Sequence, residues 1–160
     1  MKLLSFLSVI CSVVVLSSCQ KDDTSNPPAA KTKTELITVS AWKYNDAKLD
    51  TDNNGTGDQP LPAGLVDACT TDNTITFASN GNGTVDEGLD KCDPADPQSF
   101  PFTWNFTSTE TVLNFSSSLF AGVGGDFKII SLTDTELVLS KSLTVPPNPF
   151  PFTVVISFKH

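Results

Sequence analysis

Two segments of this chain alternate large apolar residues with residues that, except for Val155, are polar or proline, and this pattern limits what the chain can fold into. The first segment carries its apolar residues at Phe100, Phe102, Trp104 and Phe106, and the second carries them at Phe150, Phe152, Val154, Ile156 and Phe158. Successive side chains of a β-strand point to opposite faces, so a period of two places one set in a core and the other towards solvent. An amphipathic helix would need a period of 3.6. The pattern therefore predicts antiparallel strands with one buried face.

The same period recurs along most of the chain. Shorter apolar pairs predict further strands at Ile75 with Phe77, Leu113 with Phe115, Phe127 with Ile129, and Leu137 with Leu139. Turn signals separate them at 80–83, 124–125, 133–134 and 146–149. With a first strand near 42–49, the total is about eight. Short connections predict an all-β antiparallel up-and-down barrel, or else a sandwich, and 34–40 is either a short helix or the start of a strand.

The N-terminus has the features of an export signal. Lys2 precedes an apolar run over 3–16, which is too short to span a bilayer and is followed by small residues. Residues 16–19, with the sequence LSSC, resemble the lipobox of bacterial lipoproteins. That resemblance implies cleavage after residue 18 and attachment of acyl chains such as palmitate to Cys19. The alternative is an ordinary signal peptide with an incidental cysteine.

Residues 19–33 are polar and contain Pro27 and Pro28, which predicts a flexible tether before a domain at 34–160. The sequence QKDD directly after Cys19 resembles the surface-export signal of Bacteroidota-type lipoproteins, although Thr24 departs from that pattern. The resemblance implies an outer-membrane protein that is lipid-anchored and exposed at the cell surface. A merely soluble tether is the alternative.

The net charge limits the binding partners that we expect, and the cysteine count predicts a disulfide. The formal net charge is −8, which opposes binding to nucleic acid or to an anionic membrane surface, so we expect membrane contact through the lipid alone. We expect a monomer. Cys69 and Cys92 remain once Cys11 leaves with the signal and Cys19 takes lipid; in an exported protein they predict one disulfide, with two free thiols as the alternative.

A calcium loop is the clearest candidate metal site. The first nine positions of an EF-hand loop are matched by Asp50, Asp52, Asn54, Gly55, Thr56 and Asp58. However, Leu61 stands where a bidentate glutamate belongs, and flanking prolines oppose a following helix. We expect either an isolated Ca²⁺ loop completed by a distant acid such as Asp67 or Asp86, or a solvated turn.

Nothing in the sequence favours an enzyme. His160 is the single histidine, and no serine or cysteine has the context of an activated nucleophile. A second acidic cluster surrounds Cys92, at Asp86, Glu87, Asp90, Asp93 and Asp96. Such a cluster is either a solvated surface or, less simply, a pair of acid/base carboxylates.

The order of several short motifs resembles the lipocalin-like domains of small Bacteroidota-type lipoproteins. The motifs are Trp42-Lys43, the 50–55 segment, Cys69 with 72–77, 81–84, 87–88 with Cys92, 102–104, and 132–133 leading to 137–139. The resemblance implies a small up-and-down barrel with one end open to an apolar ligand. The aromatic residues that would line such a cavity are Trp42, Phe77, Phe102, Trp104 and Phe152. Alternatively, they simply fill the core.

These expectations combine into two functions. The first is a lipid-anchored binding module for a small apolar ligand, a glycan or a protein partner. The second is a structural or accessory lipoprotein with a solid core and no small-molecule ligand. Apart from possible Ca²⁺, no cofactor is expected.

Overall fold

The computed structural model describes residues 29–120, 123–144 and 151–160. The predicted signal peptide, Cys19, most of the predicted tether and the proline-rich turn at 146–149 lie outside the described residues. Within the described part, residues 31–160 form one compact unit. No helix in that part is both long enough and apolar enough to cross a membrane.

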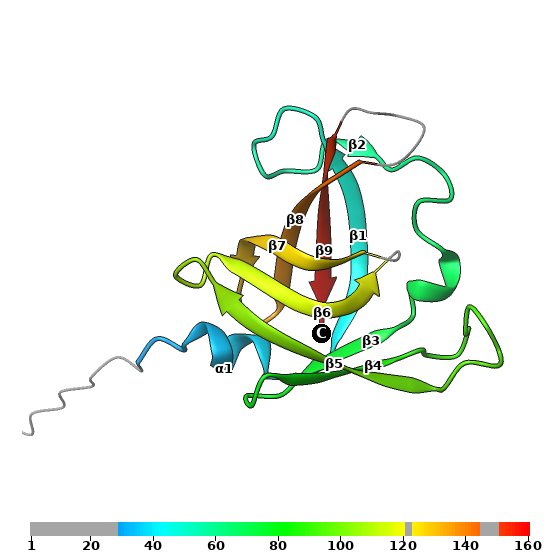
Figure 1. Ribbon diagram of the computed structural model, residues 1–160. Helices are drawn as coiled ribbons and strands as arrows, with labels where there is room; N and C mark the ends of the chain where they lie inside the picture. The colour runs from blue at the N-terminus through cyan, green and yellow to red at the C-terminus, as the bar shows by residue number, and fades with distance from the viewer. Residues whose placement is uncertain (1–28, 121–122, 145–150) are drawn as a thin grey trace, which may run out of the picture. The chain divides into compact units, whose positions relative to one another are not determined.

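The described residues form a β-barrel with very little helix (Figure 1). The helical elements are α1 (Lys33–Ile37) and a single 3₁₀ turn, Ala68–Thr70. The strands are β1 (Trp42–Asp50), β2 (Gln59–Pro60), β3 (Thr74–Phe77), β4 (Asn82–Asp86), β5 (Ser99–Thr107), β6 (Val112–Phe120), β7 (Val123–Leu132), β8 (Glu136–Leu143) and β9 (Phe152–Lys159). The segment 34–40, for which the sequence left helix or strand open, is mostly helix.

Eight of these strands close the barrel, while β2 is a two-residue addition to the end of β1. Each strand from β3 to β9 pairs antiparallel with the next, and β1 pairs with both β3 and β9. The closing seam runs from Lys43 opposite Lys159 to Asp50 opposite Thr153, with one irregularity between Tyr44 and Asp46. The predicted antiparallel up-and-down barrel of about eight strands is therefore confirmed. Closure removes the open edges through which β proteins aggregate.

The alternation in the sequence separates the inside of the barrel from its outside. On β5, Phe102 and Trp104 are buried, whereas Thr103 and Asn105 are exposed. Inward side chains from all eight strands form one core. Its buried strand residues are Trp42, Ala47, Ile75, Phe77, Val85, Phe102, Trp104, Leu113, Phe115, Phe127, Leu137, Leu139, Val154, Ile156 and Phe158. Burial of each large apolar side chain stabilises the fold by roughly 1.5–3 kcal/mol.

A glycine makes room for one of these rings. Gly83 on β4 lies opposite Phe77 on one side and Phe102 on the other. A Cβ atom at position 83 would lie 2.1 Å from Cζ of Phe102, far inside van der Waals contact. The Phe102 ring thus occupies the space that a side chain at position 83 would need.

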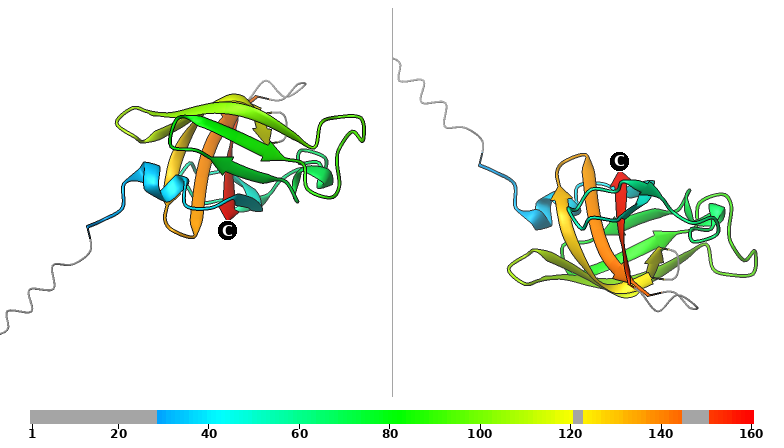
Figure 2. Two further views of the ribbon diagram at one scale, coloured as in Figure 1. Left: turned by 90° about the horizontal axis from the view of Figure 1, so that it is seen from below. Right: turned by 90° about the horizontal axis from the view of Figure 1, so that it is seen from above.

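Helix α1 seals one end of the barrel. It begins with a capping box in which Thr32 and Glu35 bond each other's backbone amides, which favours a helix start. Its last residue, Ile37, is fully buried, and the carbonyl of Ile37 accepts a hydrogen bond from Nε1 of Trp42 at 2.8 Å. The His160 ring lies 3.9 Å, centroid to centroid, from the Trp42 ring. Figure 2 shows α1 beside β7 and β8 at this end.

Candidate functional site

The interior of the barrel is almost completely filled. The void between β1, β3 and the strands opposite has a volume of only about 10 Å³. That is about the least space that holds one water molecule. Trp42 and Phe77 border this void, while Phe102 and Trp104 pack edge-on against Phe77 with centroid distances of 5.5 and 5.4 Å. Nε1 of Trp104 donates to the carbonyls of Ala78 and Asn82.

The five aromatic residues expected to line a cavity are therefore not gathered around one. Four of them are buried in the packed core, and Phe152 is half-buried at the start of β9. None of the five lines the larger pocket described next.

That larger pocket is apolar and lies at the end of the barrel opposite α1. Its volume is about 190 Å³. Inward side chains of three neighbouring strands and the connection after β2 form it, with contributions from Leu61, Leu65, Val66, Val123, Phe127, Lys141, Leu143, Thr144, Val154 and Ile156. We call it the mouth pocket. Apart from Phe127, its apolar lining is aliphatic, in contrast to the aromatic centre of the barrel.

Lys141 is the one charged residue among the described residues that line the mouth pocket. It occupies an inward position on β8, and its ammonium lies 4.7 Å from the centroid of the Phe127 ring. The ammonium donates to the carbonyls of Gly124 and Asp126 on the neighbouring strand. A cation over an aromatic face is attracted to the ring, and the long apolar stem of lysine can line an apolar wall.

The predicted calcium loop brings its carboxylates together. One oxygen from each of Asp50, Asp52 and Asp58 lies within 4.8 Å of the others. The loop follows β1 and returns to pair with it through β2, which places Asp58 beside Asp50. Asp50 is 4% exposed, and its two oxygens accept the backbone amides of Asn54 and Gly55.

The remaining polar groups of the loop bond mainly within it. Asp52 accepts from the backbone and side-chain amides of Asn54, and Oδ1 of Asn54 accepts the Thr56 amide. Asp58 accepts from the amide and hydroxyl of Thr51. Calcium binding there remains a prediction, since carboxylates tied to backbone amides also describe an ion-free turn.

The second acidic segment is held by a disulfide. Cys69 and Cys92 are bonded, with a Cα–Cα distance of 5.2 Å, so the predicted pairing is confirmed. Asp72 also holds this segment in place, because its Oδ2 accepts hydrogen bonds from the backbone amides of Leu89 and Asp90. These two hydrogen bonds, the one from Leu89 first, hold the pKa of Asp72 below its usual value.

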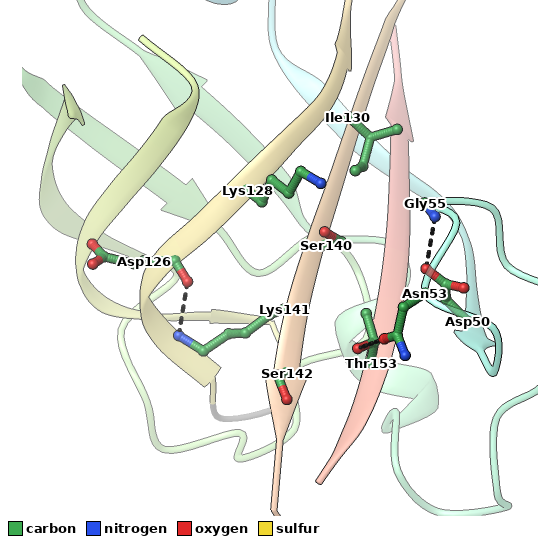
Figure 3. Close-up of a pocket in the computed structure, with 10 residues that line it drawn as sticks. All are labelled: Asp50, Asn53, Gly55, Asp126, Lys128, Ile130, Ser140, Lys141, Ser142 and Thr153. Carbon is green, nitrogen blue, oxygen red and sulfur yellow. Dashed lines mark hydrogen bonds between the residues drawn. The ribbon is translucent and has the colours of Figure 1, made fainter. Parts of the chain in front are cut away.

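A wider and more polar hollow lies on the outer face of the barrel (Figure 3). Its volume is about 500 Å³. It lies above β7, β8 and β9, and the loop after β1 forms one wall. Its lining residues are Asp50, Asn53, Gly55, Asp126, Lys128, Ile130, Ser140, Lys141, Ser142 and Thr153. We call it the outer hollow.

Comparison with known proteins identifies the family. A family model described as a lipocalin-like domain matches residues 38–139, which cover β1 to the first half of β8. The chain belongs to the lipocalin-like domain family. No curated protein matches the chain. In this lipocalin-like barrel the family resemblance, the sequence alternation and the closed sheet agree.

Sequence reasoning predicted the lining of neither pocket of the lipocalin-like barrel, although it named Asp50 and Gly55 in the predicted calcium loop and Phe127, Val154 and Ile156 in predicted strands. Lys141 sits at an inward position that continues the Leu137–Leu139 alternation, a signal that could have placed it inside the barrel. Lys128 and Ser140 are cross-strand partners on the outer face, and nothing in either strand alone predicts that pairing.

Proposed function

We propose that this lipocalin-like protein is a non-catalytic binding module that takes a compact apolar group into the mouth pocket. The observation that carries the proposal is an apolar pocket at one end of a barrel whose other end is sealed by α1. Small-molecule sites are typically concave and mostly apolar. The pocket is smaller than the roughly 300–1,000 Å³ usual for drug-sized ligands. The occupant is therefore a small molecule, or the apolar end of a larger one.

The pocket size sets the expected chain length. A volume of about 190 Å³ leaves room for a short apolar chain only. Each buried methylene contributes about 0.8 kcal/mol, which is close to a fourfold gain in affinity. In a series of primary alcohols we expect affinity to rise with each added carbon and to level off once the chain fills the pocket. Calorimetric or NMR titration measures this directly.

Matched substitutions test the location. Leu61→Trp introduces a larger side chain into the pocket lining and should abolish the gain with chain length. Leu89→Trp is the control, because Leu89 is 98% exposed and lies outside the pocket lining. Equal affinities for short and long alcohols, or unchanged binding by Leu61→Trp, would contradict the proposal.

One observation favours the second function, an accessory lipoprotein without a small-molecule ligand. The deep interior holds a void of only about 10 Å³, so much of the barrel is solid. Absence of binding across the alcohol series, together with absence of any co-purifying small molecule in native mass spectrometry, would favour this function.

We also propose that the protein is anchored in the outer membrane through lipid on Cys19 and faces outward as a monomer. The support is the lipobox-like segment 16–19 and the QKDD that follows it. Several acyl chains make such an anchor stable where one would be marginal. Metabolic labelling with an alkyne analogue of palmitate should label the parent protein but not Cys19→Ala. Labelling of both, or of neither, would refute the lipid anchor, and protease treatment of intact cells tests the outward orientation.

A further inference from the structure

The outer hollow is built from two cross-strand pairs on the outer face of the barrel. Lys128 on β7 lies opposite Ser140 on β8, and Ser142 on β8 lies opposite Thr153 on β9. Because both pairs point outward, they place one ammonium and three hydroxyls on adjacent strands (Figure 3). The loop after β1 borders them, with Gly55 against the Ile130 side chain.

Most charged groups around the outer hollow are already hydrogen-bonded. Both oxygens of Asp50 accept backbone amides of its own loop. Oδ1 of Asp126 accepts from the side-chain amide of Asn114, and Figure 3 shows this carboxylate pointing away from Lys141 and Ser142. The Lys141 ammonium donates to two carbonyls.

The Lys128 ammonium, in contrast, has no such hydrogen bond within the described residues. The exposed Lys128 side chain reaches across β8 near Ser140, and its ammonium makes no hydrogen bond or ion pair with any residue in the described part of the chain. The hollow of this acidic protein therefore carries a cation that is available to a ligand. The Asn53 amide group stands on the rim, with its oxygen accepting from the Thr153 hydroxyl at 2.8 Å.

We propose that the outer hollow binds a small hydroxylated carboxylate of the sugar-acid class, with the carboxylate on the Lys128 ammonium. Ser140 and Ser142 offer hydroxyls that both donate and accept hydrogen bonds, and the Thr153 oxygen, whose proton goes to Asn53, still accepts; such a row matches a ligand rich in hydroxyls. One available lysine matches one negative charge. This site lies on the outer face, has Lys141 in common with the lining of the mouth pocket, and does not depend on the function proposed for that pocket.

The lining also excludes other ligand classes. Among the described residues, Ile130 is the one large apolar side chain in it, which leaves little surface for a lipid chain. No aromatic side chain of the described part of the chain lines it, so a planar base or ring has nothing to stack on there. A volume of about 500 Å³ lies within the range usual for small-molecule sites.

Titration of the full-length protein in mild detergent with glucuronate and with glucose tests the proposal. The two sugars share most of their hydroxyls and differ in the carboxylate. We expect glucuronate to bind with a millimolar dissociation constant and glucose to bind at least about tenfold more weakly. Amide shifts in NMR spectra should be largest at Ser140, Ser142 and Thr153. Binding should weaken as salt rises, because the charges lie at the surface.

Three substitutions complete the test. Lys128→Gln removes the charge and should weaken glucuronate binding at least about fivefold, whereas Lys43→Gln removes an exposed lysine outside the hollow and should leave it unchanged. Ser142→Tyr should block the hollow without altering the core. Equal affinity for the two sugars, absence of binding at millimolar glucuronate, wild-type affinity in Lys128→Gln, or shifts centred on the mouth pocket would each overturn the proposal.

Discussion

Replacement of Gly83 by alanine tests whether the packing of Phe102 fixes the core. The added Cβ would lie 2.1 Å from Cζ and 2.5 Å from both Cε atoms of the Phe102 ring. The ring has little room to retreat, because Phe77 and Phe115 lie 5.5 and 6.1 Å from it, centroid to centroid. Overpacking of this kind typically costs about 1–3 kcal/mol.

Whether Gly83→Ala raises or lowers the stability decides between the two cases. The φ angle of Gly83 is not in the left-handed region, and glycine within a strand is otherwise less favourable than alanine by roughly 0.5–1 kcal/mol. Without a clash, Gly83→Ala should therefore stabilise the protein. With the clash, we expect a net loss of about 1–2 kcal/mol, which for about 130 ordered residues lowers Tm by roughly 4–8 °C.

Urea and thermal unfolding followed by circular dichroism provide the measurement. Phe102→Leu should be destabilising alone, but in the Gly83→Ala background it should cost less, so a double-mutant cycle should show favourable coupling. Thr84→Ala, at the exposed neighbouring position, is the control and should change stability by less than about 0.5 kcal/mol. A Tm for Gly83→Ala at or above the parent value would refute the packing argument.

Three further predictions concern the loops. Replacement of Cys69 and Cys92 by serine should cost about 3 kcal/mol in the chain-entropy model for a separation of 23 residues, measured by urea unfolding. The lowered pKa of Asp72 means that its contribution to stability is present at neutral pH and is lost as the pH falls below about 4, so Asp72→Asn should flatten the acid side of the stability–pH curve. If the loop after β1 binds Ca²⁺ with a dissociation constant of about 1 mM, about 10 mM calcium should stabilise the protein by about 1.4 kcal/mol, and Asp52→Ala should remove that gain in a thermal shift assay. Unchanged stability in the serine variant, an unaltered acid slope, or a Tm indifferent to calcium would contradict these three expectations in turn.

The sequence was informative about the barrel because strand alternation is a local signal. Phe102 and Trp104 share a face by their spacing alone, and the closed sheet then gives that face one interior to fill. The disulfide could also be predicted, because Cys69 and Cys92 had few alternative partners.

The two pockets could not be predicted from the sequence in the same way. Aromatic residues were expected around a cavity, but Phe102 and Trp104 pack against Phe77, and Trp42 packs against His160. The space lies instead among aliphatic residues such as Val154. The outer hollow depends on the register between β7, β8 and β9 and on a loop that folds over them from β1. Register between strands is a property of the assembled sheet, so a single sequence does not reveal it.

The seam between β1 and β9 has a consequence for how the chain reaches its fold. Lys43 pairs with Lys159, and β9 also pairs with β8 along its whole length. Until β9 has been synthesised, β1 and β8 are both open edges that can pair with other chains. Contacts so distant in sequence form slowly, because the loop-closure entropy must be overcome first. Ribosomes that stall before β9 would therefore release chains prone to aggregation, and a chaperone that protects this protein would need to shield those two strands until the last one arrives.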